Sequence, residues 1–257
     1  MNTFGRELKK IVHHHYVITT TADIDAYKHI TDLFLSMDIK FKFFEMCTPG
    51  EVPQAFVSKT IGNYNRRKYM RDYDFVNSKY TRARMLLTYY ILWCHCQKVH
   101  PGETVMIWED SIVLNNSLSE DEFIYVLSSS VDEFTNLKYD IILLGHFHQQ
   151  FKTYYTDDGK SRIKCDIPVN GYSHFSQNLL KLDYSFPAGA TIYSPRGLDK
   201  LIKGFEEMVK GKLIYPIQCF IANMMEGDFE AYGVIYPLFG QLLEYDSIVL
   251  RNVLILK

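Results

Sequence analysis

The sequence predicts a mixed α/β fold in which helices cover both faces of one mostly parallel sheet. Short apolar runs with β-branched residues alternate along the chain with longer segments whose apolar residues recur at helical spacing. The strand–helix–strand order repeats, and parallel strands require crossover connections of that kind. With 257 residues, of which 47% are hydrophobic, the chain can bury a sizeable core as one large domain or two small ones.

The first part of the chain carries two predicted strands and two predicted helices. Residues 16–20 form a short apolar strand, and a helix follows Asp23 because apolar residues recur there every three or four positions. Residues 40–46 alternate apolar side chains with lysines, as in a strand with one wet face. Residues 54–79 are polar, aromatic and weakly periodic, which is typical of an inserted or mobile segment. Residues 81–99 predict a long helix with one apolar side.

The remaining elements continue the alternation. Residues 105–108 read as a buried strand, and a helix over residues 119–137 opens with Ser119 followed by acids. Further strands are expected over residues 139–144 and 188–194, with an amphipathic helix over residues 196–210. The sequence Asp-Asp-Gly-Lys at residues 157–160 predicts a hairpin turn between two strands.

The most informative segment is Val-Met-Ile-Trp-Glu-Asp-Ser-Ile-Val-Leu at residues 105–114. Its apolar run leads directly into Glu109, Asp110 and Ser111. Carboxylates at the end of a buried strand face the crevice in which open α/β sheets bind ligands. Their hard oxygen atoms suit Mg²⁺ or Mn²⁺ on a phosphate-bearing substrate. The alternative is a pair of loop acids that only caps the next segment.

Charge excludes two classes of partner. The formal net charge is −2 and the pI is about 6.5, so no global basic field points to nucleic acid or an anionic membrane. The densest basic cluster is either a solvated face or a local collar for a phosphate or anionic sugar; it comprises Arg66, Arg67, Lys68, Arg71, Lys79, Arg82 and Arg84.

Cysteine usage and hydropathy indicate a cytoplasmic, intracellular protein. Five cysteines lack a framework spacing, and Cys94-His95-Cys96 has no second ligand pair nearby, so reduced thiols are expected and zinc is not. No signal-peptide core and no run of eighteen apolar residues is present, so no membrane span is expected. The run His13-His14-His15 enters the first strand and is interpreted as native and structural.

Several segments, in order, carry a family resemblance. The chain resembles the lipooligosaccharide-type glycosyltransferases of family 25, which include bacterial galactosyltransferases and collagen galactosyltransferase domains. The matching segments begin with Tyr16-Val-Ile-Thr-Thr, Thr88-Tyr-Tyr-Ile-Leu-Trp93, Val105-Met-Ile-Trp-Glu-Asp-Ser111 and Asp140-Ile-Ile-Leu-Leu-Gly145. They continue with Gly189-Ala-Thr-Ile-Tyr-Ser-Pro-Arg-Gly-Leu-Asp-Lys-Leu201, Pro216-Ile-Gln218 and Tyr236-Pro-Leu-Phe-Gly-Gln241 with Ser247.

This resemblance implies a GT-A-like, Rossmann-like nucleotide-sugar fold in a single domain over residues 1–257. Its nucleotide-binding half would cover about residues 10–115 and its acceptor half about residues 116–257. The implied activity is transfer of a sugar such as galactose or glucose from a UDP-sugar to a glycan or glycoprotein acceptor, with Mn²⁺ or Mg²⁺ as cofactor.

The resemblance also implies site residues. Donor contacts would come from Thr19, Thr20, Thr21, Trp108 and Glu109. The metal ligands would be Glu109, Asp110, Ser111 and His148. Asp110 and Gln218 occupy the catalytic positions.

Two positions depart from the family pattern. Ser111 stands where the family has a second aspartate, and Gln218 stands where it has an acid. An amide cannot act as a base at neutral pH, so either another residue compensates or transfer activity is lost. The residues weighed for compensation are Asp228, Glu226, His146 and His148. A non-catalytic GT-A-like binding domain is therefore the first alternative.

Gly145-His-Phe-His148 motivates a second alternative, a metal-dependent phosphoesterase. Enzymes of that type end a strand with two histidines that address a two-metal centre. However, Tyr64 and Asn65 stand where such an enzyme carries a histidine and an acid after Gly62-Asn63.

Overall fold

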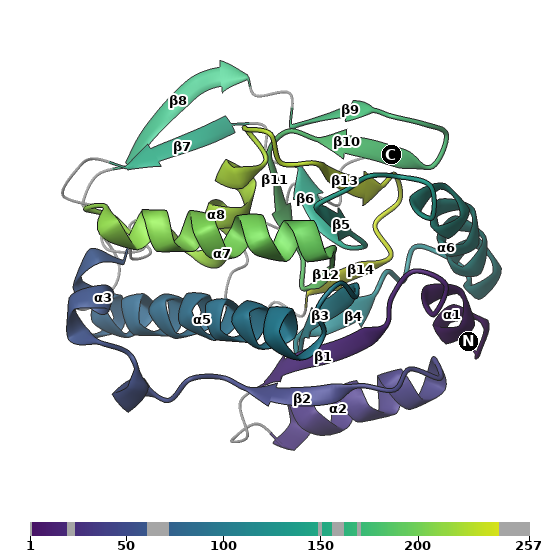
Figure 1. Ribbon diagram of the computed structural model, residues 1–257, viewed down its shortest axis with the longest axis horizontal. Coiled ribbons are helices and arrows are strands. Elements are labelled where there is room, and N and C mark those ends of the chain that lie inside the picture. Colours follow the sequence, from purple (N-terminus) through teal and green to yellow (C-terminus); the bar gives the residue numbers. More distant parts are fainter. Residues whose placement is uncertain are drawn as a thin grey trace.

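The computed structural model describes residues 2–19, 24–60, 72–148, 151–155, 162–168 and 171–241. An eight-stranded sheet forms its centre, with helices on both faces (Figure 1). The strand order is β2 (Lys42–Glu45), β1 (His14–Thr19), β3 (Val105–Glu109), β12 (Ala190–Tyr193), β5 (Ile141–Leu143), β13 (Ala231–Val234), β10 (Leu179–Leu182) and β9 (Tyr172–His174).

Most strands of this sheet share one direction. β1 is parallel to both β2 and β3, and β5 is parallel to β13. β12 lies antiparallel between β3 and β5, so those two strands point the same way. β10 is antiparallel to β13 and to β9. The predicted mixed α/β fold with a mostly parallel, helix-covered sheet is confirmed.

Strand residues alternate between two hydrophobic cores, one on each face of the sheet. The first core contains Val17 and Met106 and is covered by α1 (Asn2–Leu8), α2 (Ile24–Ser36) and α6 (Glu120–Phe134). The second contains Ile18 and Ile107 and is covered by α3 (Gln54–Lys59), α5 (Asp72–Val99), α7 (Pro195–Lys210) and α8 (Ile217–Met224). In Figure 1, α5 and α7 lie side by side over the second core.

Three short antiparallel pairs and a 3-10 turn, η1 (Pro49–Glu51), complete the described elements. β4 (Ile112–Leu114) pairs with β14 (Phe239–Gln241), and β6 (His146–His148) pairs with β11 (Ser185–Pro187). β7 (Phe151–Tyr155) pairs antiparallel with β8 (Arg162–Pro168), whereas the turn predicted at residues 157–160 lies outside the described residues.

Local sequence signals explain where two helices begin. The Ser119 hydroxyl accepts a hydrogen bond from the Glu122 amide, and the Glu122 carboxylate accepts one from the Ser119 amide, which closes a capping box at the start of α6. In α7, the Ser194 hydroxyl accepts from the Gly197 amide, and Pro195 occupies the first turn. A side chain at Gly197 would collide with the Asp140 carbonyl, so glycine lets α7 pack against β5.

The segment 54–79 differs from its prediction. Part of it is α3, and α5 begins at Asp72, well before the expected start at Thr81. The weak periodicity arises because α3 is short and because the early part of α5 carries few apolar residues. Most of the basic cluster, residues 66–71, lies outside the described residues, whereas Arg84 donates from Nε to the Cys47 carbonyl at 2.6 Å.

The structure also bears on the expected reduced cysteines and on the expected absence of a membrane span. Cys47, Cys94, Cys96 and Cys219 are free thiols. Among the described helices, none combines the length and the apolar character needed to cross a bilayer.

Candidate functional site

The carboxyl ends of β1 and β3 lie at a switch point of the sheet. From β1 the chain passes through α2, on one face, to β2; it then returns past β1 through α5, on the opposite face, to β3. The strand order therefore reverses at β1, with β2 on one side of it and β3 on the other, and open α/β sheets bind ligands beyond the carboxyl ends of the strands at such a point. Ile18 is the register partner of Glu109, so the acid pair begins where β1 ends.

Glu109 is buried on the α5 side of the sheet. Its Oε1 accepts a hydrogen bond of 2.8 Å from the Tyr89 hydroxyl, and its amide donates to the Gly189 carbonyl at 2.8 Å. Burial, together with the Glu109 charge, raises the pKa of Tyr89 well above its usual range. Tyr89 therefore remains a neutral donor that holds the carboxylate in place.

Asp110 and Ser111 form the turn between β3 and β4, and both are half-buried. The Asp110 amide donates to the Ile18 carbonyl at 3.2 Å, which fixes this turn against the end of β1. The Asp110 charge also contributes to the raised pKa of Tyr89. Two carboxylates and a hydroxyl thus lie in sequence at these strand ends, with Glu109 buried and Asp110 nearer solvent.

The predicted donor residues fall into different environments. Thr19 ends β1, is buried, and its carbonyl accepts from the Met46 amide at 2.9 Å. Thr20 and Thr21 lie outside the described residues. The Trp108 indole has no exposed surface; it packs edge-on against Phe34 and Phe239 in the first core. That indole stabilises the core and cannot stack on a ligand in this arrangement.

The other predicted site residues lie on different elements. Gln218 is half-buried near the start of α8, which packs on β11 and α5. His148 belongs to β6, and its side chain lies outside the described residues. Asp228 and Glu226 are exposed beyond α8, and Asp228 pairs with Lys200 at 3.4 Å.

His146 has a structural position. Its imidazole is buried, and Nε2 lies 2.8 Å from the Val234 carbonyl, which can only accept, so Nε2 carries the proton. The ring lies so close to Gly233 that a Cβ there would approach it to 2.9 Å. These contacts favour packing of β6 against β13 as the role of His146, in place of metal binding through Nε2.

Sequence reasoning missed Tyr89 and Gly189 as neighbours of the acid pair. The signal for Tyr89 was available, since strand alternation turns Glu109 to the face opposite Trp108, where the helix over residues 81–99 was expected. Nothing in the sequence indicated that β12 would run antiparallel and place Gly189 beside Glu109.

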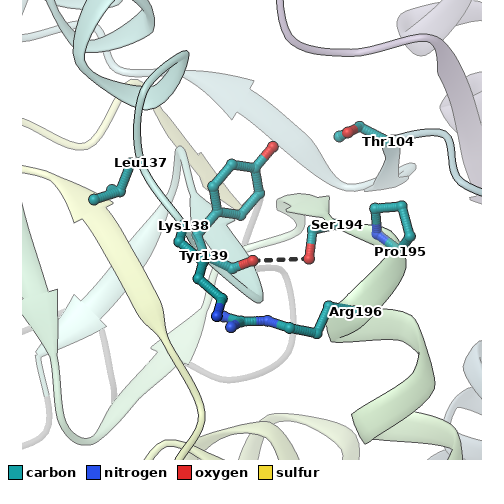
Figure 2. A pocket seen from close by; sticks show the side chains of 7 residues that line it. All are labelled: Thr104, Leu137, Lys138, Tyr139, Ser194, Pro195 and Arg196. Atoms are coloured by element: carbon teal, nitrogen blue, oxygen red, sulfur yellow. Dashed lines mark hydrogen bonds between the residues drawn. The ribbon is translucent and has the colours of Figure 1, made fainter.

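A hollow of about 380 Å³ opens at the opposite edge of the sheet, near the amino ends of β3 and β5 (Figure 2). Its lining includes Lys138, Ser194 and Arg196, and the Ser194 hydroxyl donates to the Tyr139 carbonyl at 2.8 Å. Arg196 Nε also donates to the fully buried Asp140 at 2.6 Å, so this cation is engaged in holding α7 to β5.

Comparisons with known proteins identify no family for this chain. No family model matches the chain, so the resemblance to glycosyltransferase family 25 is not confirmed, and no curated protein matches it. A UDP-glucose pyrophosphorylase complexed with UDP-glucose is similar at a TM-score of 0.43 and 7% identity, over 90% of this chain and 92% of that chain. An apo UDP-glucose pyrophosphorylase gives 0.43 and 4% over the same shares. A likeness at these values establishes neither a shared family nor a shared activity.

Proposed function

We propose that the chain binds a nucleotide sugar, in particular a UDP-sugar, at the carboxyl ends of β1 and β3. In this proposal it transfers the sugar to a glycan or glycoprotein acceptor with the help of Mn²⁺ or Mg²⁺. The observation that carries the proposal is the place of Asp110: a half-buried carboxylate at the switch point of the sheet, fixed by its amide to the end of β1.

The residues at these strand ends would have different roles, according to how deeply each is buried. Asp110, with Ser111 beside it, would hold the divalent ion, whose positive charge would stabilise the negative charge that develops on the leaving nucleotide. Glu109 would complete this anionic surface from below, with its position fixed by Tyr89. Because Thr19 is buried and its carbonyl accepts from Met46, contacts to the base and ribose would come from the residues that follow it, Thr20 and Thr21.

A second candidate function is binding of the nucleotide sugar without transfer. It is favoured by the Glu109 carboxylate, which is buried and already accepts from Tyr89, and by Gln218, whose amide cannot serve as a base. In this case Asp110 would still bind the metal and donor, but no carboxylate would activate the acceptor hydroxyl.

An assay of donor turnover tests the proposal and separates the candidates. Purified protein is incubated with a panel of UDP-sugars and Mn²⁺, and release of UDP is measured with and without glycan acceptors. Transfer predicts UDP release with one sugar, reduced about a hundredfold in Asp110→Asn because metal-held charge stabilisation is lost. The matched control is Asp32→Asn, an exposed carboxylate on α2, which should leave the rate unchanged.

The remaining outcomes have distinct meanings. Thermal stabilisation by one UDP-sugar with no UDP release would support the binding candidate. Metal-dependent cleavage of a simple phosphoester, lost in a folded His146→Ala variant, would replace both with a phosphoesterase. No response to any nucleotide sugar would refute the proposal.

A further inference from the structure

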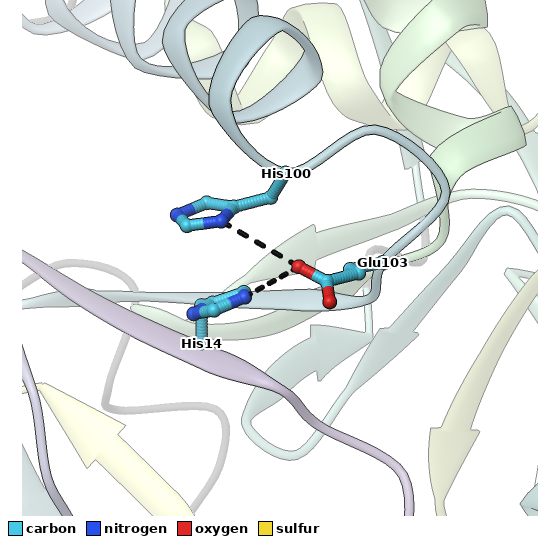
Figure 3. Close-up of side chains that lie close together, drawn as sticks. All are labelled: His14, His100 and Glu103. Carbon is cyan, nitrogen blue, oxygen red and sulfur yellow. Dashed lines mark hydrogen bonds and ion pairs between the residues drawn. The ribbon is translucent and has the colours of Figure 1, made fainter.

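A cluster of two histidines and a glutamate lies at the amino ends of β1 and β3, at the edge opposite Asp110 (Figure 3). His14 is the first residue of β1, His100 follows the end of α5, and Glu103 precedes β3. Glu103 Oε2 lies 2.7 Å from His14 Nε2 and 3.5 Å from His100 Nδ1. The two imidazole rings stack at 3.5 Å between centroids.

The donor atoms are spaced as a metal ion requires. One nitrogen from each histidine and one carboxylate oxygen all lie within 4.8 Å of one another. In a tetrahedral zinc site, metal–ligand bonds of about 2.0–2.1 Å place neighbouring donors about 3.3 Å apart. The distances from Glu103 lie on either side of that value. Because an imidazole binds a metal in its ring plane and the two rings are stacked, one ring has to turn out of the stack for both nitrogens to face the same ion.

A hydrogen-bond network orients the buried ligand. His100 Nε2 lies 2.8 Å from the Tyr16 hydroxyl, which also lies 3.3 Å from His95 Nε2. This contact directs the other ring nitrogen, Nδ1, toward Glu103 (Figure 3). Metal-binding histidines are held in this way by a partner on the nitrogen that does not bind the ion.

We propose that His14 Nε2, His100 Nδ1 and Glu103 Oε2 bind one Zn²⁺ ion, with water at the fourth position. Two imidazoles and one carboxylate form a ligand set that zinc favours over Mg²⁺ or Mn²⁺. Binding through Nε2 requires the His14 proton to reside on Nδ1, so a neutral ring changes tautomer and a protonated ring releases one proton to solvent. Because the ligands come from three segments, the ion would join β1 to both ends of the α5–β3 connection and stabilise the fold.

Zinc binding by the metal-free protein tests this proposal without any nucleotide. Titration calorimetry should show one Zn²⁺ per chain, and Co²⁺ should give the absorption bands of a tetrahedral site. His14→Ala and Glu103→Gln should each weaken binding at least about tenfold. Glu103 is half-exposed, so its substitution leaves the fold intact, which circular dichroism verifies.

Two control variants distinguish the proposed site from zinc binding by other histidines. His174→Ala removes an exposed histidine from β9, and His13→Ala removes the exposed neighbour of His14; both should bind zinc like the unmodified protein. If His13→Ala abolishes binding while Glu103→Gln does not, the ion is held by the histidine run alone and the proposed site is wrong. Absence of stoichiometric binding to the unmodified protein would equally overturn it.

Discussion

Glu109 and Asp110 are adjacent in sequence but face different surroundings. Glu109 points into the second core and accepts from Tyr89, whereas Asp110 lies at the turn nearer solvent. The sequence indicated a carboxylate pair at a strand end, but the depth of each acid depends on which helix covers which face. The pair is thus one buried carboxylate and one half-buried carboxylate at the turn, and the position of Asp110 nearer solvent makes it the principal metal-ligand candidate.

Tyr89→Phe tests the role of the buried contact. Removing the hydroxyl leaves a buried carboxylate without this donor, so we expect the free energy of unfolding to fall by about 2 kcal/mol. Tyr90→Phe is the matched control, since its hydroxyl donates to the exposed Glu206 and should cost less than about 0.5 kcal/mol. Urea unfolding of both variants gives the comparison, and equal losses would refute a structural role for Tyr89.

The starts of α6 and α7 were predicted to within one residue, whereas the start of α5 was not. Ser119 followed by acids marked the beginning of α6, and the capping box is present. By contrast, α3, α8 and the short strands β4, β6, β11 and β14 were not anticipated, because segments of three to eight residues carry too few apolar positions to show a period. Their structure is set by the larger elements on which they pack.

The cap of α6 provides a prediction with a pH dependence. Ser119→Ala should lower the free energy of unfolding by about 1 kcal/mol at neutral pH, whereas Ser129→Ala, within the same helix, should have little effect. Hydrogen bonds from the Ser119 side chain and backbone hold the pKa of Glu122 below its usual value of 4.5.

Because this folded-state pKa is lowered, the Glu122 contribution is complete above 4.5 and is lost as pH falls through the folded value. The difference between the unmodified protein and Ser119→Ala should therefore shrink at about pH 3 in urea titrations. A difference that is independent of pH would show that Glu122 takes no part in the cap.

Asp140 joins two elements, the start of β5 and the first turns of α7. This fully buried carboxylate accepts from Arg196 Nε at 2.6 Å and from Lys200 Nζ at 3.0 Å. Asp140→Asn should cost about 3 kcal/mol of unfolding free energy, because it leaves both cations short of a buried counter-charge. Asp228→Asn removes an exposed partner of the same Lys200 and should cost less than about 0.5 kcal/mol. Similar losses for the two variants would contradict this account.

At the scale of the whole molecule, the predicted alternation of strands and helices produced the observed helix-covered sheet. The direction of β12 was not predictable, because apolar runs look alike whichever way a buried strand runs. That reversal determines the site, since it places Gly189 against Glu109. Prediction from sequence therefore placed the acid pair at the end of β3, while the neighbours of that pair became known only from the three-dimensional arrangement.

The most direct test of the proposed function is calorimetric titration of UDP into the protein with and without Mn²⁺. We predict binding that depends on Mn²⁺, is weakened at least about tenfold by Asp110→Asn, and is unchanged by Glu103→Gln at the opposite edge. Metal-independent binding that Asp110→Asn leaves intact, or no binding of UDP to the unmodified protein, would contradict the assignment of the β1–β3 crevice as a nucleotide-sugar site.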